Sequence, residues 1–242
     1  MSDAVVFNGL NSLDFQAVRA NVVRIPEVAA RLSEAQKLWD KFSPEEFGFY
    51  NFLCSDDDSF LKNIHFKSLA AAIVQVGLYD RYTKPFRRPE YLIGCSNCDS
   101  ALHVAVGQKS FADLILDSSA LNLQKNEGNV RTLTAVSEQP VLSGISLTEY
   151  QVYQFDHEAS RYQAMDLKDM DINKLVRALI DNHSVHKFIN IGPGNLLLMD
   201  LQKELALSEV QMMESVDIDP MLSWFWSSVK KPVTGMSVVG EQ

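Results

Sequence analysis

Short apolar runs alternate with helical patterns along most of the chain, and this alternation limits the fold more than any other feature of the sequence. The apolar runs are residues 4–8, 91–94 and 186–192, and the helical stretches between them are residues 26–42, 60–82 and 172–182. Strands that alternate with helices are typical of βαβ units, in which helices cover a parallel sheet. The sequence therefore predicts an α/β fold, with a parallel sheet flanked by helices.

Local signals add detail to this scheme. Pro26 opens the first helical stretch, at a position where its missing N–H would have no helical partner. Ser43 followed by Pro and two glutamates predicts a second helix start, and Ser110 predicts a cap for a helix over 110–115. Residues 150–155 alternate and fit either a strand or a turn of helix. We expect two further strands at 131–136 and 140–145, and a helix after Gly194.

Composition excludes several classes of function. The chain has 242 residues, a net charge of −9 and a pI of about 5.0, so it is poorly suited to a nucleic-acid backbone. We expect a single domain over 1–242, in the cytoplasm, without a secretory leader or a membrane span. The segment around Lys84, Arg87 and Arg88 is locally basic and suits an acidic ligand.

A strand, a tight turn and a helix are predicted in residues 91–107, YLIGCSNCDSALHVAVG. This is the layout of a nucleophile elbow, in which a serine sits at the top of a sheet beside backbone N–H groups that stabilise an oxyanion. Ser96 occupies the nucleophile position. The same residue also fits the N-cap of a helix that begins near Asn97. Both interpretations stay open on spacing alone.

Cys95 and Cys98 form a C-x-x-C pair in the same turn. Such a pair before a helix is typical of thiol redox sites, because the helix N-terminus lowers a thiol pKa. A zinc site would need Cys54 or histidines from distant parts of the chain, and no second C-x-x-C exists. Two small thiols that pack the turn are the third interpretation. We expect no metal site.

A serine nucleophile needs a base within hydrogen-bond reach, and the chain has five histidines. His103 lies seven residues after Ser96, about two helical turns away, which is too far along the helix to touch the hydroxyl. His183 and His186 precede a buried strand and are expected at the other end of the sheet. His157, in a less regular region with acidic neighbours, is the candidate base.

Four segments together resemble the malonyl-CoA:acyl-carrier-protein transacylase family of fatty-acid and polyketide biosynthesis. They are, in order, residues 5–13, 69–82, 94–115 and 188–201. The two most specific are GCSNCDSALHVAVGQKSFADLI, which resembles G-H-S-L-G-E-x-x-A-L-x-x-A-G-x-x-S-F-x-D-A-V, and FINIGPGNLLLMDL, which resembles F-x-E-V-G-P-G-x-x-L-x-x-L. The resemblance implies an α/β-hydrolase-like acyltransferase core and places Ser96 at the acyl-accepting serine.

The sequence departs from the family at several functional positions. Leu10 stands where the family has an oxyanion glutamine, and Cys95 and Cys98 replace the elbow histidine and second glycine; Asn97 completes the expected oxyanion turn. Leu121 stands near the place of the arginine that binds the malonyl carboxylate. The small ferredoxin-like subdomain is expected to be reduced or missing, with 116–170 as its truncated remainder.

Three functions follow from this resemblance and these departures. The first is a diverged acyltransferase, or acyl hydrolase, that moves an acyl group between coenzyme A and an acyl-carrier protein through Ser96. The second is a pseudoenzyme that binds a carrier protein or a synthase component. The third is a thiol-redox protein. The expected substrates are a coenzyme A thioester and a phosphopantetheinyl carrier, with no tightly bound cofactor.

Overall fold

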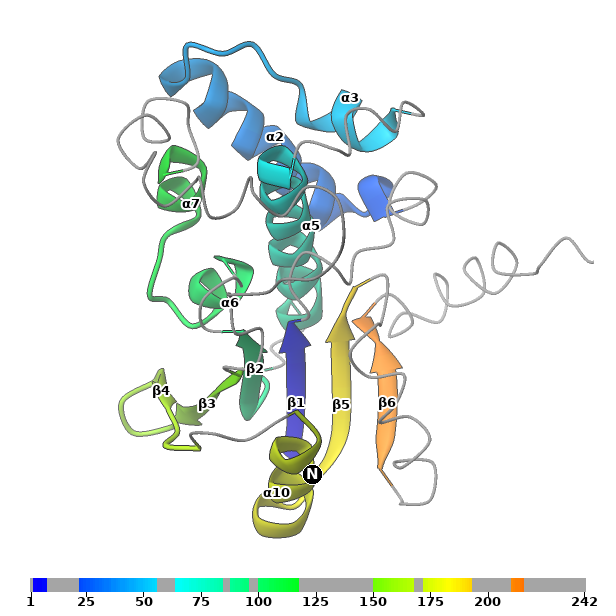
Figure 1. Ribbon diagram of the computed structural model, residues 1–242, viewed down its shortest axis with the longest axis vertical. Coiled ribbons are helices and arrows are strands. Elements are labelled where there is room, and N and C mark those ends of the chain that lie inside the picture. The colour runs from blue at the N-terminus through cyan, green and yellow to red at the C-terminus, as the bar shows by residue number, and fades with distance from the viewer. Residues whose placement is uncertain are drawn as a thin grey trace, which may run out of the picture.

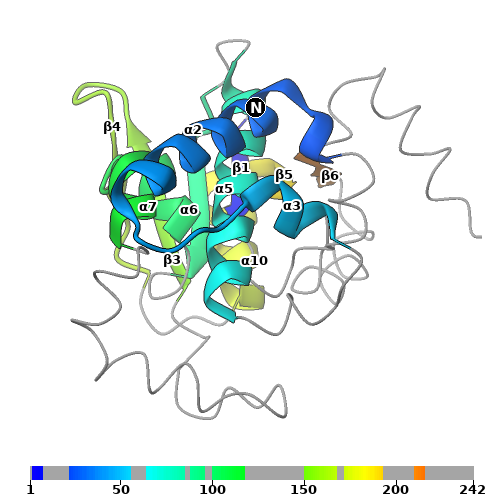
Figure 2. The same ribbon diagram turned by 90° about the horizontal axis from the view of Figure 1, so that it is seen from above.

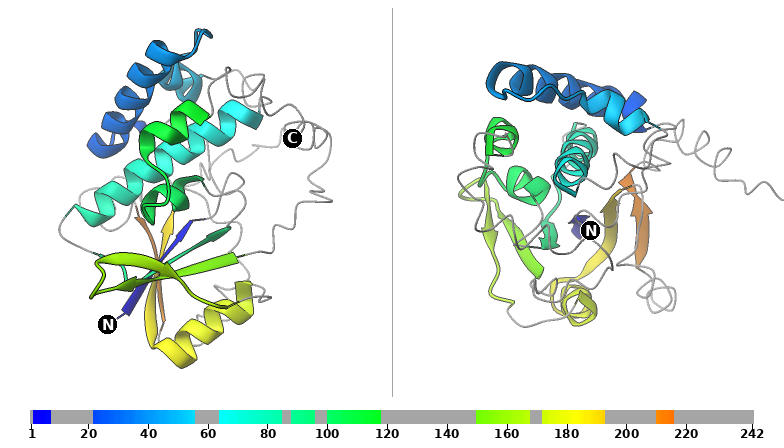
Figure 3. Two further views of the ribbon diagram at one scale, coloured as in Figure 1. Left: turned by 90° about the vertical axis from the view of Figure 1, so that its left-hand side faces the viewer. Right: turned by 45° about the horizontal axis from the view of Figure 1, so that its top comes forward.

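A mostly parallel sheet lies between two layers of helices in the computed structural model (Figures 1 and 3). The structure describes residues 2–7, 22–55, 64–84, 88–95, 100–117, 150–167, 172–192 and 210–215. Within these ranges the strands are β1 (Ser2–Phe7), β2 (Tyr91–Cys95), β3 (Tyr150–Asp156), β4 (Arg161–Ala164), β5 (Val185–Ile191) and β6 (Gln211–Glu214). Their order in the sheet is β4-β3-β2-β1-β5-β6. The predicted α/β class is confirmed.

The strand directions refine the prediction. Strands β2, β1, β5 and β6 run parallel, as expected for crossover connections. Strand β3 runs antiparallel to β2, and β4 forms a hairpin with β3. This hairpin falls inside 116–170, the range expected to hold a reduced insert, and it extends the main sheet. Residues 150–155 are thus a strand, and the two other strands expected at 131–136 and 140–145 lie outside the described residues.

The helices agree closely with the periodic stretches of the sequence. They are α2 (Pro26–Phe42), α3 (Phe49–Cys54), α5 (Ile64–Thr83), α6 (Ser100–Ala105), α7 (Phe111–Asp117) and α10 (Ile172–His183), with a short 3-10 helix at Val22–Arg24. Pro26 is the first residue of α2, as predicted. Among these described helices, none combines the length and apolarity needed to cross a bilayer.

Two hydrophobic clusters hold the layers together. On one face of the sheet, Val5, Leu92 and Ile189 pack with helices α2, α3, α5, α6 and α7. On the other face, Val6 and Ile93 pack against the apolar side of α10. Figure 3 shows α10 on one side of the sheet and the other described helices on the opposite side. Because strand side chains alternate, each central strand contributes to both clusters.

The helix start predicted at Ser43 is wrong. The N–H of Ser43 donates to Trp39 O, which closes the last turn of α2, and the next helix begins at Phe49. Side chains of α2 bind the backbone that follows: Trp39 Nε1 donates to Glu45 O at 2.7 Å and Gln36 Nε2 to Phe47 O at 2.7 Å. These bonds hold the segment against α2 in an irregular path.

Helices α2 and α5 cross in close contact (Figure 2). The contact forms at Gly77, where a Cβ atom would lie 2.7 Å from the Cα of Val28. The stretch from Leu69 to Leu78 is buried throughout, as its apolar composition predicts. Glycine therefore lets the buried helix α5 approach the backbone of the outer helix α2.

Candidate functional site

The parallel strands bring their carboxyl ends to one edge of the sheet. From β1 the chain continues to β2 on one side, whereas from β5 it continues to β6 on the other. The strand order therefore reverses between β1 and β5, and ligands of open α/β sheets bind at such switch points, beyond the carboxyl ends. We call this edge the carboxyl edge; Figure 1 shows it at the top of the sheet, where the arrows of β1 and β5 end.

Strand β2, which directly precedes Ser96 in the sequence, ends at this edge. Strand β2 ends at Cys95 and α6 begins at Ser100, so four residues connect them. The predicted strand and helix on either side of the turn are confirmed. Ser96 and Asn97 themselves lie outside the described residues, as do Leu10 after β1 and the side chain of Cys95. The roles expected for these residues stay predictions.

His157 lies at the opposite edge. The antiparallel register pairs Tyr91 with Gln154 and Cys95 with Tyr150, so the turn after β3 lies beside the start of β2. There His157 Nε2 is 3.1 Å from a carboxylate oxygen of Glu90. Strand β2 extends about 15 Å from the neighbourhood of this pair to its other end at Cys95, at about 3.3 Å per residue. Within the described residues His157 thus lies at the amino edge, and its role as the base for Ser96 stays a prediction.

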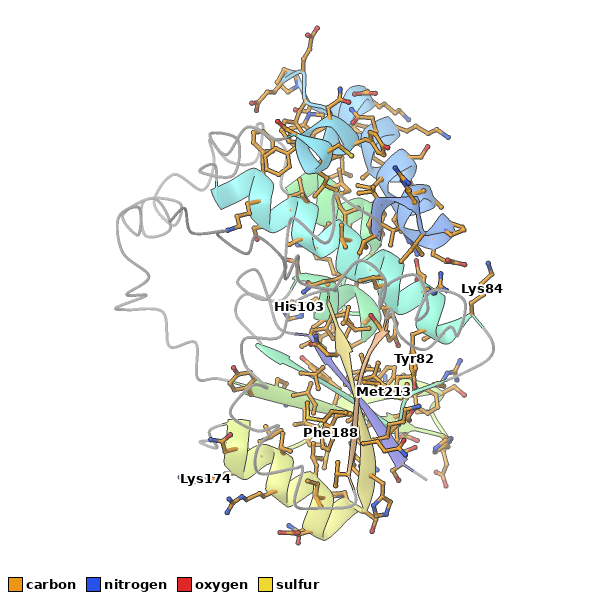
Figure 4. All side chains as sticks on the ribbon, turned by 90° about the vertical axis from the view of Figure 1, so that its right-hand side faces the viewer. Tyr82, Lys84, His103, Lys174, Phe188 and Met213 are labelled. Atoms are coloured by element: carbon orange, nitrogen blue, oxygen red, sulfur yellow. The ribbon has the colours of Figure 1, made fainter. Side chains whose placement is uncertain are left out.

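The other histidines occupy different parts of the fold. His183 ends α10 and its Nδ1 is 3.5 Å from the Tyr91 hydroxyl, while His186 lies near the start of β5; both are at the amino edge, as predicted. His103 lies on α6, on the side where the strands end (Figure 4). Its Nδ1 is 2.8 Å from Gln108 Oε1. His65 is in the first turn of α5, and its side chain lies outside the described residues.

Buried polar side chains mark the carboxyl edge. Asn190, next to last in β5, and Ser215, directly after β6, are each 2% exposed. In the part of the chain that the structure describes, Ser215 Oγ is a buried oxygen without a hydrogen-bond partner. The sequence analysis missed both residues, although the Asn in the apolar run FINIG was a usable signal, because polar residues in buried strands need a specific partner.

The amino edge is fixed by internal hydrogen bonds. The Tyr82 hydroxyl at the end of α5 donates to Asp3 Oδ2, and the N–H of Glu90 donates to Asp3 Oδ1 at 3.2 Å. Tyr162 donates to Pro89 O at 2.9 Å. Burial raises the pKa of Tyr162, and the neighbouring phenol of Tyr79 adds to the effect, so both groups stay neutral. These contacts give the edge a structural role.

The structure describes Lys84 and Arg88 of the basic segment and the side chain of Cys54. Lys84 Nζ lies 2.6 Å from Glu27, and the Arg88 guanidinium stacks over the Phe155 ring; Arg87 lies outside the described residues. Cys54 is a free, half-buried thiol. Within the described ranges, no three His, Cys, Asp or Glu side chains gather in a geometry for a metal ion. A redox role for Cys95 and Cys98 stays a prediction.

Comparison with solved structures identifies proteins that share this fold. The MCAT of Streptococcus pneumoniae matches with a TM-score of 0.58 and 12% identity, over 92% of this chain and 100% of that chain. The malonyl-CoA:ACP transacylase of Synechocystis matches with a TM-score of 0.56 and 11% identity, over 88% of this chain and 97% of that chain. A malonyl-transacylase solved in complex with its type II PKS acyl-carrier protein gives 0.56 and 12%, over 94% and 100%.

Sequence comparison gives no such match. No family model matches the chain. No curated protein matches it significantly either. The chain thus has the fold of the malonyl-CoA:ACP transacylases. Because the sequence identity is low, the match establishes the fold only, and the resemblance noted in the sequence is confirmed for the fold.

Proposed function

We propose that the chain is a diverged acyltransferase that moves an acyl group from coenzyme A to an acyl-carrier protein through Ser96. The observation that carries the proposal is the four-residue connection from β2 to α6, one strand away from the β1/β5 switch point. Solved proteins of the same fold are malonyl-CoA:ACP transacylases, and one of them was solved with its carrier protein.

The reaction has two balanced steps. The Ser96 oxygen attacks the thioester carbonyl, the carbon–sulfur bond breaks, and the hydroxyl proton passes to the departing coenzyme A thiolate. The carrier thiol then attacks the serine ester, and its proton returns to the serine oxygen as that ester breaks. Both steps need a general base within hydrogen-bond reach of the Ser96 hydroxyl, and His157, the candidate base, lies beside Glu90 at the amino edge. The acyl group is not assigned, because Leu121 replaces the carboxylate-binding arginine.

The position of His157 also favours a second candidate function. The sequence retains the serine of the elbow, but the candidate base, His157, lies at the amino edge. This combination fits a catalytically inactive protein that binds a carrier protein or a synthase component. Loss of a general base costs about 10²- to 10⁴-fold in rate. Leu10, in place of the oxyanion glutamine, points the same way.

Intact mass after incubation with acetyl-, malonyl- and longer acyl-CoA donors separates the two functions. The acyltransferase predicts an acyl adduct that disappears in Ser96→Ala and persists in His157→Ala, the matched variant at the opposite edge. Absence of an adduct with every donor would refute the enzyme. Equal capture of a holo-acyl-carrier protein by the wild type and Ser96→Ala would then support the inactive partner.

A further inference from the structure

Five side chains at the amino edge form one chain of hydrogen bonds. His157 Nε2 lies 3.1 Å from a carboxylate oxygen of Glu90, and Gln154 Nε2 donates to the other oxygen at 3.2 Å. The same Gln154 nitrogen donates to the Tyr91 hydroxyl at 3.3 Å, and that hydroxyl is 3.5 Å from His183 Nδ1. We call this chain the amino-edge relay, because it joins the turn after β3, the start of β2 and the end of α10.

The relay has a direction, which the charge of Glu90 sets. An ionised carboxylate only accepts hydrogen bonds, so the side-chain amide of Gln154 must present its NH2 group to Glu90 rather than its oxygen. The same NH2 group donates to the Tyr91 oxygen. The Tyr91 hydroxyl therefore donates its own proton to His183, whose Nδ1 must be an unprotonated acceptor. A neutral His183 with its proton on Nε2 completes the relay.

The Tyr91 hydroxyl depends on this acceptor because it is buried. Tyr91 is 3% exposed, and its ring packs edge-on against the His183 imidazole at 5.7 Å between centroids. Burial raises the pKa of the Tyr91 phenol, and the negative charge of Glu90 adds to the effect, so the hydroxyl keeps its proton. A buried hydroxyl proton is costly to leave without an acceptor.

Protonation of His183 removes the acceptor. An imidazole ordinarily takes up a proton near about pH 6.5, and both of its nitrogens are then donors. The Nδ1–H of His183 would face a hydroxyl that already accepts from Gln154. One contact of the relay must therefore break. The bond between Gln154 and Glu90 is the stronger one because its acceptor is ionised, so the contact between Tyr91 and His183 breaks first.

The two ends of the relay respond to acid in different ways. Protonated His157 forms an ion pair with ionised Glu90, so the carboxylate end stays in place. The neighbouring ionisable groups at that end are Asp3, Arg88, Asp156 and Glu158. Those near the His183 end are Asp181 on α10 and His186 and Lys187 on β5. Acid therefore acts on the end of the relay that holds α10.

We propose that the amino-edge relay is an acid-sensitive switch: neutral His183 holds the end of α10 against Tyr91, and protonation of His183 releases that end from β2. Among the described helices, α10 is the one that packs on this face of the sheet, so the switch sets how firmly the face is covered (Figure 3). The inference goes beyond the proposed acyl transfer and does not depend on it.

Amide hydrogen exchange in the last turn of α10 measures the release. Rates at about pH 8 and about pH 5.8, corrected for intrinsic exchange, should show about three- to tenfold faster opening of the wild type in acid, as expected for loss of one hydrogen bond. His183→Phe keeps a ring against Tyr91 but takes up no proton, so its opening should not change with pH. His157→Phe, the matched variant at the other end of the relay, should keep the acid response of the wild type.

Glu90→Gln separates the relay from simple attraction between charges. If Glu90 only attracted protonated His183, removal of its charge would increase the release of α10 in acid. In the relay, a neutral amide at position 90 also donates, so Gln154 can turn, accept the Tyr91 proton and reduce the acid response.

Nitrogen NMR of the wild-type imidazoles at about pH 8 tests the relay without any variant. The relay requires the proton of His183 on Nε2, and a proton on Nδ1 would overturn it. The proposal also falls if the opening of the wild type does not change with pH, if the acid response persists in His183→Phe or is lost in His157→Phe, or if Glu90→Gln enlarges it.

Discussion

Gly77→Ala tests the packing between α2 and α5, because close packing predicts a loss of stability where an open helix surface predicts a gain. In an unhindered helix interior, Gly→Ala stabilises by about 1 kcal/mol. Here the added Cβ would lie 2.7 Å from Val28 Cα and 3.1 Å from Val28 N, and both are backbone atoms that a rotamer change cannot move. Overpacking of this kind costs about 1–3 kcal/mol. With the contact against backbone at the upper end of that range, Gly77→Ala should destabilise by about 1–2 kcal/mol.

Urea and thermal unfolding followed by circular dichroism measure this difference. We expect the melting temperature to fall by about 2–8 °C with an unchanged urea m-value. Val28→Ala should not restore the loss in the double variant, because the closest atom is Cα rather than the side chain. Gly77→Val should be worse than Gly77→Ala. A melting temperature of Gly77→Ala equal to or above that of the wild type would refute the close helix contact.

Three further substitutions test other contacts. Burial acts to raise the pKa of Glu27, but the hydrogen bond from Lys84 and the charges of Lys84 and Arg81 outweigh burial, so the pKa lies below 4.5. The stability of the wild type should therefore fall as acid protonates this carboxylate. Over a pH series of urea unfolding, the stability of Glu27→Gln should fall less. Tyr162→Phe leaves Pro89 O without its donor and should lower the free energy of unfolding by about 1–2 kcal/mol. Because the pKa of Tyr162 is raised in the fold, the stability of the wild type should fall above about pH 10, and the stability of Tyr162→Phe should fall less there. Because nothing lies within 4 Å of an added Cβ, Gly107→Ala should cost about 1 kcal/mol for its φ of +79° alone. Gly107→Asn should cost less, because asparagine adopts the left-handed region more readily than alanine; equal losses in thermal unfolding would contradict a purely backbone effect.

The elements that the sequence predicted well are those with strong local patterns. The apolar runs of β1, β2 and β5 and the periodicity of α2 and α5 mark their own buried faces. Strands β4 (RYQA) and β6 (QMME) escaped detection because they are short and lie at the sheet edges, where few of their side chains are buried. Their pairing depends on neighbours that are distant in sequence, which no local window contains.

The wrong helix start at Ser43 has a related cause. The Ser-Pro-Glu-Glu pattern is a sound local signal for a helix. In the folded chain, however, Trp39 and Gln36 hydrogen-bond the carbonyls of Glu45 and Phe47, and the Phe49 N–H donates to Gln36 Oε1 at 3.0 Å. Side-chain bonds from the preceding helix replace the bonds that a new helix would make. A local pattern is overridden by a partner that packs beside it.

Strand direction decides which edge of the sheet His157 occupies. In a parallel sheet, a residue that follows a strand lies at the carboxyl edge, beside the elbow. Because β3 runs antiparallel to β2, the turn that follows it lies at the amino edge instead, where His157 meets Glu90. Direction depends on how the chain returns between α7 and β3, and apolar alternation in YQVYQF is the same for either direction. The sequence pattern therefore could not predict at which edge of the sheet His157 lies.

Among the described residues, the polar groups at the two edges of the sheet differ in how their hydrogen bonds are satisfied. At the amino edge, Asp3 binds both Tyr82 and the backbone of Glu90, and the Tyr91 hydroxyl faces His183 and Gln154. Groups that are fully used within the fold have little left to offer a ligand. At the carboxyl edge, Ser215 is buried, and within the described residues its hydroxyl has no hydrogen-bond partner; an unpaired buried hydroxyl costs about 1–3 kcal/mol, so this edge, unlike the amino edge, carries a polar group that the described fold does not satisfy.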